Sequence, residues 1–327
     1  MKILLVRVSS MGDVLHNMPI VDDLLRQFPQ AQIDWVVEEA YVSLVRLHPG
    51  VRQIFPFALR RWRKSLRAAA TRAEIGAFVK KLRAERYDLV LDTQGLLKTG
   101  LIMGLAQLAT GGKKIGLANG TEGSGYEGVS RIFHDQSVPV DRCTHAVLRG
   151  RLVAAAAGGY VVDGPASFGL QAPQIQPDWR PAQPYVVFFH GTARASKKWA
   201  HANWVAIGQA LAASGMPILL PWGNLAEKAE AVSLAAELPQ ARVLPALPMM
   251  EAVALAQGAA LAIGVDTGLV HIAAAYERPT IEIYCDSPRW KTEGNWSDKI
   301  VNLGDAGRPA TVAQVALAIR QLLSNQA

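Results

Sequence analysis

The chain has 327 residues, of which 50% are hydrophobic and 19% are charged, and its formal net charge is +7. This length exceeds that of most single cores and predicts a globular chain of two domains rather than a disordered one. The two cysteines, Cys143 and Cys285, lack metal-ligand spacing, which predicts a reducing compartment and no disulfide framework. The histidines form no HExxH pair and there is no Asp-x-Asp, so we expect no required metal.

The positive charge favours a polyanionic partner, which is nucleic acid, an anionic membrane face or a phosphorylated substrate. No helix-turn-helix, zinc-finger or RNA-recognition pattern supports nucleic acid. Residues 199–226 contain no Asp, Glu, Lys or Arg, but glycines and prolines at 215–223 interrupt them, so they cannot supply a spanning helix of ~20 residues. The short apolar run at the N-terminus is interrupted by Arg7 and does not resemble a signal peptide. We therefore expect a soluble chain.

The first element in chain order is a buried parallel strand over residues 3–8. Small residues at 9–12 end it, and a helical pattern begins at Val14. Asp13 is therefore expected at the carboxyl end of the first strand, where open α/β sheets bind ligands. Two interpretations of Asp13 stay open here, a catalytic base and a helix N-cap.

The rest of the first half alternates in the same way. Strands are expected at 33–39 and 87–94, with helices at 18–28, 40–48, 71–85, 96–108 and about 141–157. The glycine-rich stretch 115–133 predicts a mobile loop, and the four prolines of 171–184 predict a linker.

The second half restarts the alternation after the linker. Expected strands are 185–190, 217–223, 241–247, 260–266 and 280–285, and expected helices are 201–214, 225–238, 249–258, 269–276 and 311–324. The chain is thus predicted to form two consecutive doubly wound α/β domains with parallel sheets.

Three strand-to-helix junctions of the second half carry polar residues suited to a nucleotide diphosphate. The first has Thr192 followed by cations that include Lys197, and these offer a phosphate cradle or an ordinary basic loop. The second has Asp266, Thr267 and Gly268 at a helix N-terminus, which attracts anions.

His271 follows in the first turn of the same helix, either as a ligand or as a packing residue. At the third junction Trp222 is either a shield for a base or a core residue. Glu227 there either binds ribose hydroxyls or compensates the helix dipole. The sequence lacks GxGxxG after its first strand and has no P-loop, so neither a dinucleotide dehydrogenase nor a P-loop NTPase is supported and no cofactor is expected.

In the first half, the segment 59–67 places five cations around Trp62. It is either a solvated basic loop or an anion clamp for an acceptor phosphate or a lipid headgroup. Lys98 lies in the first turns of a predicted helix, where a lysine opposes the helix dipole unless an anion is near.

These segments occur in one order along nearly the whole chain, SSMGDVLHNMP, RRWRK, DTQGLLKTG, HGTARASKKW, LPWG and VDTGLVH. Together they resemble the ADP-heptose:lipopolysaccharide heptosyltransferase family of glycosyltransferases. The MGDVLH opening and the RRWRK segment are similar to the first heptosyltransferases of that family rather than to the second or third.

The resemblance implies a GT-B fold, in which two Rossmann-like domains face each other across a cleft. It implies an acceptor domain over 1–170 with helix 311–324 packing back on it, a linker at 171–184 and a donor domain over 185–310. It also implies inverting transfer of L-glycero-D-manno-heptose from ADP-heptose to a Kdo hydroxyl of Kdo2-lipid A, without metal or cofactor. This would occur in the cytoplasm, peripherally on the anionic inner face of the inner membrane, with no nucleic acid involved.

Site residues follow from the resemblance and from the junctions above. Asp13 matches the family's base, and Lys197 is expected to be catalytic as well as donor-binding. The other donor-binding residues expected are Thr192, Trp222, Glu227, Asp266, Thr267, Gly268, Leu269 and His271. The acceptor-binding residues expected are Ser10, Arg60, Arg61, Arg63, Lys64 and Lys98.

This sequence departs from the family pattern in two places. Ala193 stands where a second threonine is common, and 115–133 lacks an Arg-Glu-Pro-like segment that helps to meet the acceptor. The alternatives that stay open are a heptosyltransferase acting on a later core acceptor, a GT-B sugar-nucleotide epimerase, a non-catalytic nucleotide-binding module and a nucleic-acid binder.

Overall fold

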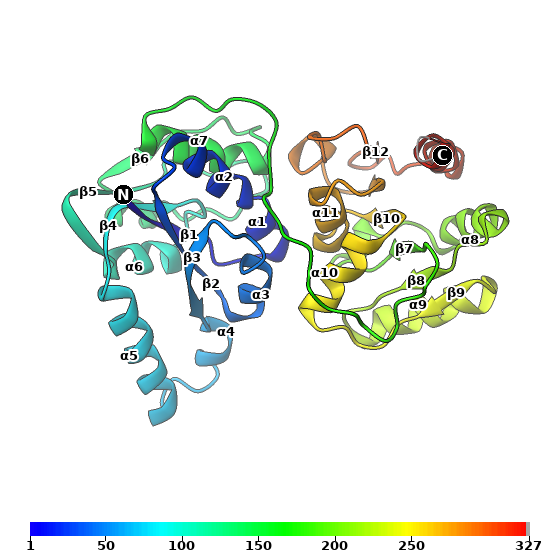
Figure 1. Ribbon diagram of the computed structural model, residues 1–327, viewed down its shortest axis with the longest axis horizontal. Helices are drawn as coiled ribbons and strands as arrows, with labels where there is room; N and C mark the ends of the chain where they lie inside the picture. The colour runs from blue at the N-terminus through cyan, green and yellow to red at the C-terminus, as the bar shows by residue number, and fades with distance from the viewer. Residues whose placement is uncertain (325–327) are drawn as a thin grey trace. The chain divides into compact units, whose positions relative to one another are not determined.

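The computed structural model describes residues 1–324 of the chain. They form two compact units, Met1–Gln171 and a second that begins at Ala172, each built on its own six-stranded sheet. Helices cover both faces of each sheet (Figure 1). The predicted pair of doubly wound α/β domains is confirmed, and the chain passes between the units where the proline-rich segment 171–184 begins.

All strand pairs of the first sheet are parallel, in the order β3-β2-β1-β4-β5-β6. In chain order the strands are β1 (Lys2–Val6), β2 (Gln32–Glu38), β3 (Val51–Phe57), β4 (Arg86–Asp92), β5 (Gln107–Leu117) and β6 (Gln136–Val138). The chain starts at the centre with β1, moves out to β3 and returns to β4 on the other side of β1. The topological switch point of this unit therefore lies between β1 and β4.

The helices of this unit are α1 (Met11–Leu15), α2 (Met18–Gln27), α3 (Val42–Val45), α4 (Leu59–Trp62), α5 (Ala69–Arg83), α6 (Leu97–Leu105) and α7 (Ala146–Gly158), with short 3-10 helices η1 (Glu39–Tyr41) and η2 (Gly128–Phe133). On one sheet face Leu4, Val6 and Phe55 pack with Trp62 of α4 and Phe78 of α5. Helices α2 and α7 lie side by side on the other face (Figure 1).

The second sheet is also all-parallel, in the order β12-β11-β10-β7-β8-β9. In chain order its strands are β7 (Val186–Phe189), β8 (Ile218–Leu220), β9 (Ala241–Val243), β10 (Leu261–Val265), β11 (Thr280–Tyr284) and β12 (Ile300–Gly304). The first three strands run outward from the centre and the last three run outward on the other side. Here the switch point lies between β7 and β10.

The helices of the second unit are α8 (His201–Leu211), α9 (Leu225–Glu237), α10 (Met249–Gly258), α11 (Gly268–Ala275) and α12 (Val312–Ser324), with 3-10 helices η3 (Ala195–Lys197), η4 (Ala212–Ser214) and η5 (Arg289–Lys291). Val315 and Ile319 of α12 are buried in the core that Ile281 and Ile283 of β11 line. The apolar face of α12 therefore contributes to the second unit, and the return of 311–324 to the first unit stays a prediction.

The structure differs from the sequence prediction in the glycine-rich region. Residues 115–117 complete β5 and residues 128–133 form η2, so 115–133 is not one loop. Phe133 packs on α6 at Gly100 and Gly104, where an ideal Cβ would lie 2.6 and 2.9 Å from its ring. The predicted helix 96–108 ends at Leu105, because its last residues begin β5. Among the helices of residues 1–324, none is long and apolar enough to cross a membrane.

Candidate functional site

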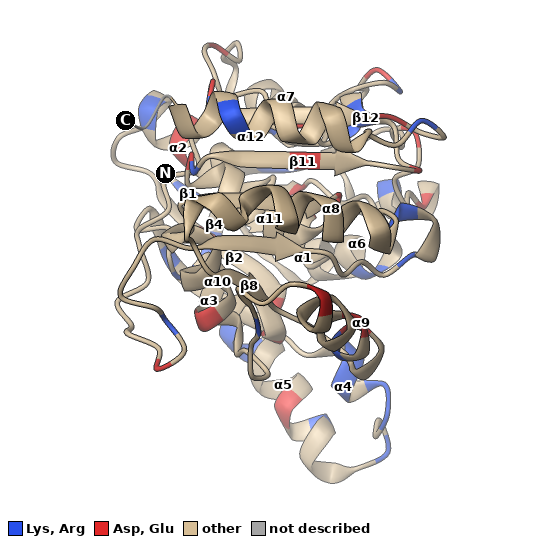
Figure 2. Ribbon diagram, turned by 90° about the vertical axis from the view of Figure 1, so that its right-hand side faces the viewer, with Lys and Arg blue, Asp and Glu red and all other residues tan. Residues whose placement is uncertain are grey.

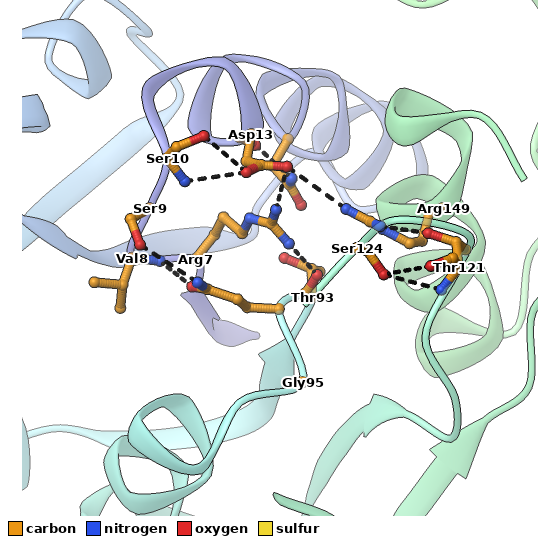
Figure 3. A network of polar contacts seen from close by, with 12 residues as sticks. Arg7, Val8, Ser9, Ser10, Asp13, Thr93, Gly95, Thr121, Ser124 and Arg149 are labelled. Carbon is orange, nitrogen blue, oxygen red and sulfur yellow. Dashed lines mark hydrogen bonds and ion pairs between the residues drawn. The ribbon is translucent and has the colours of Figure 1, made fainter. Parts of the chain in front are cut away.

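Asp13 lies in α1, directly after β1 and beside the switch point of the first sheet. The N-cap of α1 is Ser10, so the interpretation of Asp13 as the N-cap is wrong in position, because Asp13 is the third helical residue. Its Oδ2 accepts hydrogen bonds from the Ser10 amide at 3.1 Å and the Ser10 hydroxyl at 2.9 Å (Figure 3). The Asp13 side chain thus satisfies the amide of the N-cap residue Ser10 from a position within the helix.

Two buried arginines face the other oxygen of Asp13 (Figure 3). Arg7 Nη2 lies 2.5 Å from Asp13 Oδ1, and Arg7 Nη1 donates to the Thr93 carbonyl at 2.5 Å. Arg149 of α7 places Nη2 at 3.7 Å from the same Oδ1 and donates from Nη1 to Thr121 Oγ1 at 2.6 Å. One carboxylate is therefore held by two guanidinium groups that the fold itself fixes.

These charges decide the protonation state of Asp13. Burial alone would raise the pKa of its carboxyl, but Arg7, Arg149 and the Ser10 amide outweigh burial and hold that pKa well below its usual range. Burial, reinforced by Arg7, lowers the pKa of Arg149 to about 10. The Asp13 side chain keeps 35% of its surface exposed. Asp13 is thus an ionised carboxylate that a ligand can reach.

Lys98 joins Asp13 and Ser10 at this edge of the first sheet. It lies in the first turn of α6, after β4, and its Nζ donates to Ser9 Oγ at 2.9 Å. Burial lowers the pKa of the Lys98 ammonium. The structure therefore brings Lys98, Ser10 and Asp13 to the carboxyl ends of β1 and β4, as the sequence predicted.

The basic segment 59–67 forms α4 and the loop that leads toward α5 (Figure 2). Arg60, Arg63 and Lys64 are exposed. Arg61 differs, because its guanidinium forms ion pairs with Glu39 at 3.1 Å and Glu74 at 2.8 Å. The structure thus separates Arg61, whose charge is already paired, from the other cations of this segment.

Buried Trp62 fixes the segment by donating from Nε1 to Glu74 Oε2 at 2.9 Å. The core side of Trp62 is aromatic, with Phe57 and Phe78 packed against its ring. Exposed cations are therefore presented by an anchored turn rather than by a loose loop.

The three junctions of the second unit follow β7, β8 and β10, which are neighbours in the sheet. Lys197, after β7, places Nζ 2.5 Å from Oδ2 of Asp266, after β10. Glu227 Oε2 accepts the Gly223 amide at 2.7 Å after β8, and an ideal Cβ on Gly191 would lie 2.7 Å from Glu227 Cδ. The loop after β7 therefore contacts the junctions after both β8 and β10.

Asp266 is the centre of a polar cluster in this unit. Besides Lys197, it accepts hydrogen bonds from Ser287 Oγ at 2.6 Å and Thr292 Oγ1 at 3.3 Å, and its Oδ1 lies 3.0 Å from His271 Nε2. Burial would raise the pKa of the Asp266 carboxyl, but His271 and Lys197 hold it well below its usual range. Asp266 is thus ionised at neutral pH.

His271 is buried between two carboxylates. Its Nε2 faces Asp266, and its Nδ1 lies 2.8 Å from Oε1 of Glu282, which is fully buried in β11. Burial would lower the pKa of the imidazole, but Glu282 and Asp266 raise it to about 10. His271 is therefore a cation whose two ring nitrogens are both used inside the protein.

The remaining residues that were predicted to bind the donor lie in the same three junctions of the second unit, where they are at least partly exposed. Thr267 is the N-cap of α11, and half-exposed Gly268 and Leu269 begin that helix, whose first amides have no partner within it. Trp222 is also half-exposed, and its Nε1 donates to the Leu244 carbonyl at 2.7 Å. Thr192 is half-buried in the loop after β7, next to exposed Ala193. A nucleotide with a negative charge fits such an edge.

The sequence profile of glycosyltransferase family 9 (heptosyltransferase) matches residues 75–318. The chain belongs to this family. Lipopolysaccharide heptosyltransferase 1 of Pseudomonas aeruginosa is 38% identical to it over 285 residues, which cover 87% of this chain and 78% of the relative.

Two solved structures of an Escherichia coli heptosyltransferase, WaaC with ADP and WaaC with ADP-2-deoxy-2-fluoro heptose, each cover all of both chains at 32% identity, with TM-scores of 0.85 and 0.76. The protein is thus a glycosyltransferase of the lipopolysaccharide heptosyltransferase 1 type with the GT-B fold.

Sequence reasoning missed the residues of this enzyme that hold its charged groups in place. Arg7 was noted only as an interruption of an apolar strand, and Arg149 and Glu282 were not singled out. The signal for Arg7 and Glu282 was available, because a charged residue inside an apolar strand must have a buried partner. Arg149 lies in α7 and carried no such signal. No group of three or more His, Cys, Asp or Glu side chains within residues 1–324 is arranged to hold a metal ion.

Proposed function

We propose that this enzyme transfers L-glycero-D-manno-heptose from ADP-heptose to a Kdo hydroxyl of Kdo2-lipid A, with inversion and without a metal. The observation that carries the proposal is the meeting of Lys197, Asp266 and the N-terminus of α11 at one switch point. Relatives that are named heptosyltransferase 1 and a relative solved with ADP and an ADP-heptose analogue support the same donor.

In this proposal the second unit binds the donor. The diphosphate is bound by the Lys197 ammonium, by Thr192 and by the first amides of α11, at Gly268 and Leu269. These groups can donate hydrogen bonds to phosphate oxygens at this edge of the sheet. Trp222 and Glu227 contact the adenosine part. As ADP leaves, negative charge grows on its β-phosphate, and a fixed cation stabilises that charge more than the ground state.

The first unit binds the acceptor, with helix 311–324 proposed to pack back on it. Arg60, Arg63 and Lys64 attract the phosphates and carboxylates of the glycolipid, and the same cations favour a peripheral position on the anionic cytoplasmic face of the inner membrane. Arg61, Ser10 and Lys98 complete the proposed acceptor set. Arg61 already forms ion pairs with Glu39 and Glu74, so it contributes less to acceptor binding than its neighbours do.

Asp13 acts as the general base. The acceptor O–H bond breaks toward Asp13, the acceptor oxygen bonds to C1 of heptose, and the C1–O bond to the β-phosphate breaks with its electron pair on ADP. A carboxylate held by Arg7 is weakly basic, so the proton moves late, when the forming bond has made the hydroxyl acidic. Asp13 needs no activation to be ionised at neutral pH.

The experiment is an ADP-release assay with purified protein and ADP-heptose, with and without a Kdo-bearing acceptor. We expect release only when the acceptor is present, and none with an acceptor that lacks Kdo. Release without acceptor would indicate a hydrolase, and a changed heptose without ADP release would indicate an epimerase. Either outcome would overturn the proposal.

A further inference from the structure

Glu282 is a charged residue in the middle of a buried strand, and nothing in the proposed reaction uses it directly. It has no exposed surface. Its Oε1 faces His271 Nδ1 at 2.8 Å, and its Oε2 accepts from the Tyr284 hydroxyl at 2.8 Å and the Gly294 amide at 3.0 Å. Burying a carboxylate is costly unless it is paired, and these partners occupy both oxygens of Glu282.

The pairing extends through the site as four alternating charges, Lys197, Asp266, His271 and Glu282. Ser287 and Thr292 are the neutral groups on Asp266, while Tyr284 and the Gly294 amide are those on Glu282. Glu282 is the member farthest from Lys197 in this series. The contacts link it to Lys197 through His271 and Asp266.

Without the charge of Glu282, His271 would face one carboxylate that Lys197 also binds. Burial would then favour the neutral imidazole. Asp266 would lose one of its two cations and would attract Lys197 more strongly. Less of the positive potential of Lys197 would remain for a phosphate.

We propose that Glu282 is a positioning residue for the donor. Glu282 keeps His271 charged, and Asp266 then interacts electrostatically with both His271 and Lys197. The second cation on Asp266 leaves Lys197 available to a diphosphate. This inference rests on the proposed function only in taking that diphosphate to be the ligand of Lys197.

The first test compares ADP affinity of wild type, Glu282→Gln and Glu282→Asp by calorimetry from about pH 7 to about pH 9, above the ordinary range of histidine. Gln has the size of Glu but no charge, and Asp keeps the charge. The ratio of variant to wild-type affinity removes the titration of ADP itself. We expect Glu282→Gln to bind about tenfold more weakly at the upper end, with a ratio that worsens as pH rises, and Glu282→Asp to stay closer to wild type. A ratio that is equal to one or independent of pH would overturn the inference.

The second test observes His271 directly through the ¹⁵N shifts of its ring, assigned with His271→Gln. At about pH 8, above the ordinary histidine pKa, we expect both nitrogens protonated in wild type and a neutral ring in Glu282→Gln. A neutral ring in wild type would overturn the inference even if Glu282→Gln did not fold. Failure of wild type to bind ADP would instead count against the proposed donor site, since the ring spectrum is independent of ADP.

Discussion

Arg7 Nη2 lies 2.5 Å from Asp13 Oδ1, and the two residues stand on opposite sides of the turn that links β1 to α1. Arg7 is buried and is also tied to the Thr93 carbonyl after β4. The ion pair thus connects the proposed base to both strands at the switch point. It fixes the carboxylate in position and lowers its basicity at the same time.

Replacement of Arg7 tests this coupling. Arg7→Met removes the nearer cation, so the pKa of Asp13 should rise and the acid limb of the kcat/KM profile should move to higher pH. Arg149→Met is the matched control, because its guanidinium is 3.7 Å from Asp13 rather than 2.5 Å, and it should cause a smaller shift in the same direction. An acid limb that stays in place in both variants would mean that the ionisation of Asp13 does not determine how kcat/KM depends on pH.

Lys197 is expected to stabilise the departing ADP. Lys197→Ala should lower kcat by ~10²-fold or more, the scale of losing one electrostatic stabiliser. Lys198→Ala is the control, since Lys198 lies in the same loop as Lys197 but pairs with Glu230 of α9, and it should change kcat far less. Steady-state rates at saturating acceptor measure both, and equal effects would show that the loop charge matters rather than Lys197.

The basic segment should act on the acceptor alone. Replacing Arg60, Arg63 and Lys64 by Ala should raise the acceptor KM, with less effect in high salt, and should leave ADP affinity unchanged. Arg61→Ala should raise that KM less, because Glu39 and Glu74 already bind Arg61. Weakened ADP binding in the triple variant would contradict this prediction, because it would mean that the segment binds the nucleotide rather than the acceptor.

The ion pairs of His271 should make the free energy of unfolding fall as the pH becomes alkaline. The pKa of His271 is about 10 in the folded chain and ~6.5 in an unfolded one, so its contribution is complete below ~6.5 and is lost as pH rises through the folded value. Urea unfolding at a series of pH values should show a smaller loss above ~6.5 in His271→Gln than in wild type. Parallel curves would mean that His271 is neutral in the folded protein.

The sequence predicted two parallel-sheet units and the carboxyl ends of their central strands, but not every strand of the sheets. Strands β7, β8 and β10 are buried on both faces and therefore have continuous apolar patterns, which placed Lys197 and Asp266 on adjacent loops. Strands β3, β5, β6 and β12 were not predicted. All four are only partly buried, β3, β6 and β12 lie at sheet edges, and β3 includes Pro56.

The partners of charged residues were beyond sequence reasoning for a different physical reason. The contact of Arg7 with Thr93 joins positions 86 residues apart, and the pairing of Arg61 with Glu74 depends on how α4 turns back toward α5. Patterns of apolar residues set which elements form, but they do not set which polar groups meet at their ends. That is why Asp13 was located correctly while the cations that hold it were not.

The central claim is that Asp13 deprotonates a Kdo hydroxyl as heptose is transferred. The most direct measurement is mass spectrometry of the Kdo-bearing acceptor after incubation with ADP-heptose and either wild type or Asp13→Asn. We predict that wild type adds one heptose and that Asp13→Asn does so at least ~10²-fold more slowly, with unchanged ADP binding and folding. Near-normal transfer by Asp13→Asn, or no heptose on the acceptor with wild type, would contradict the account.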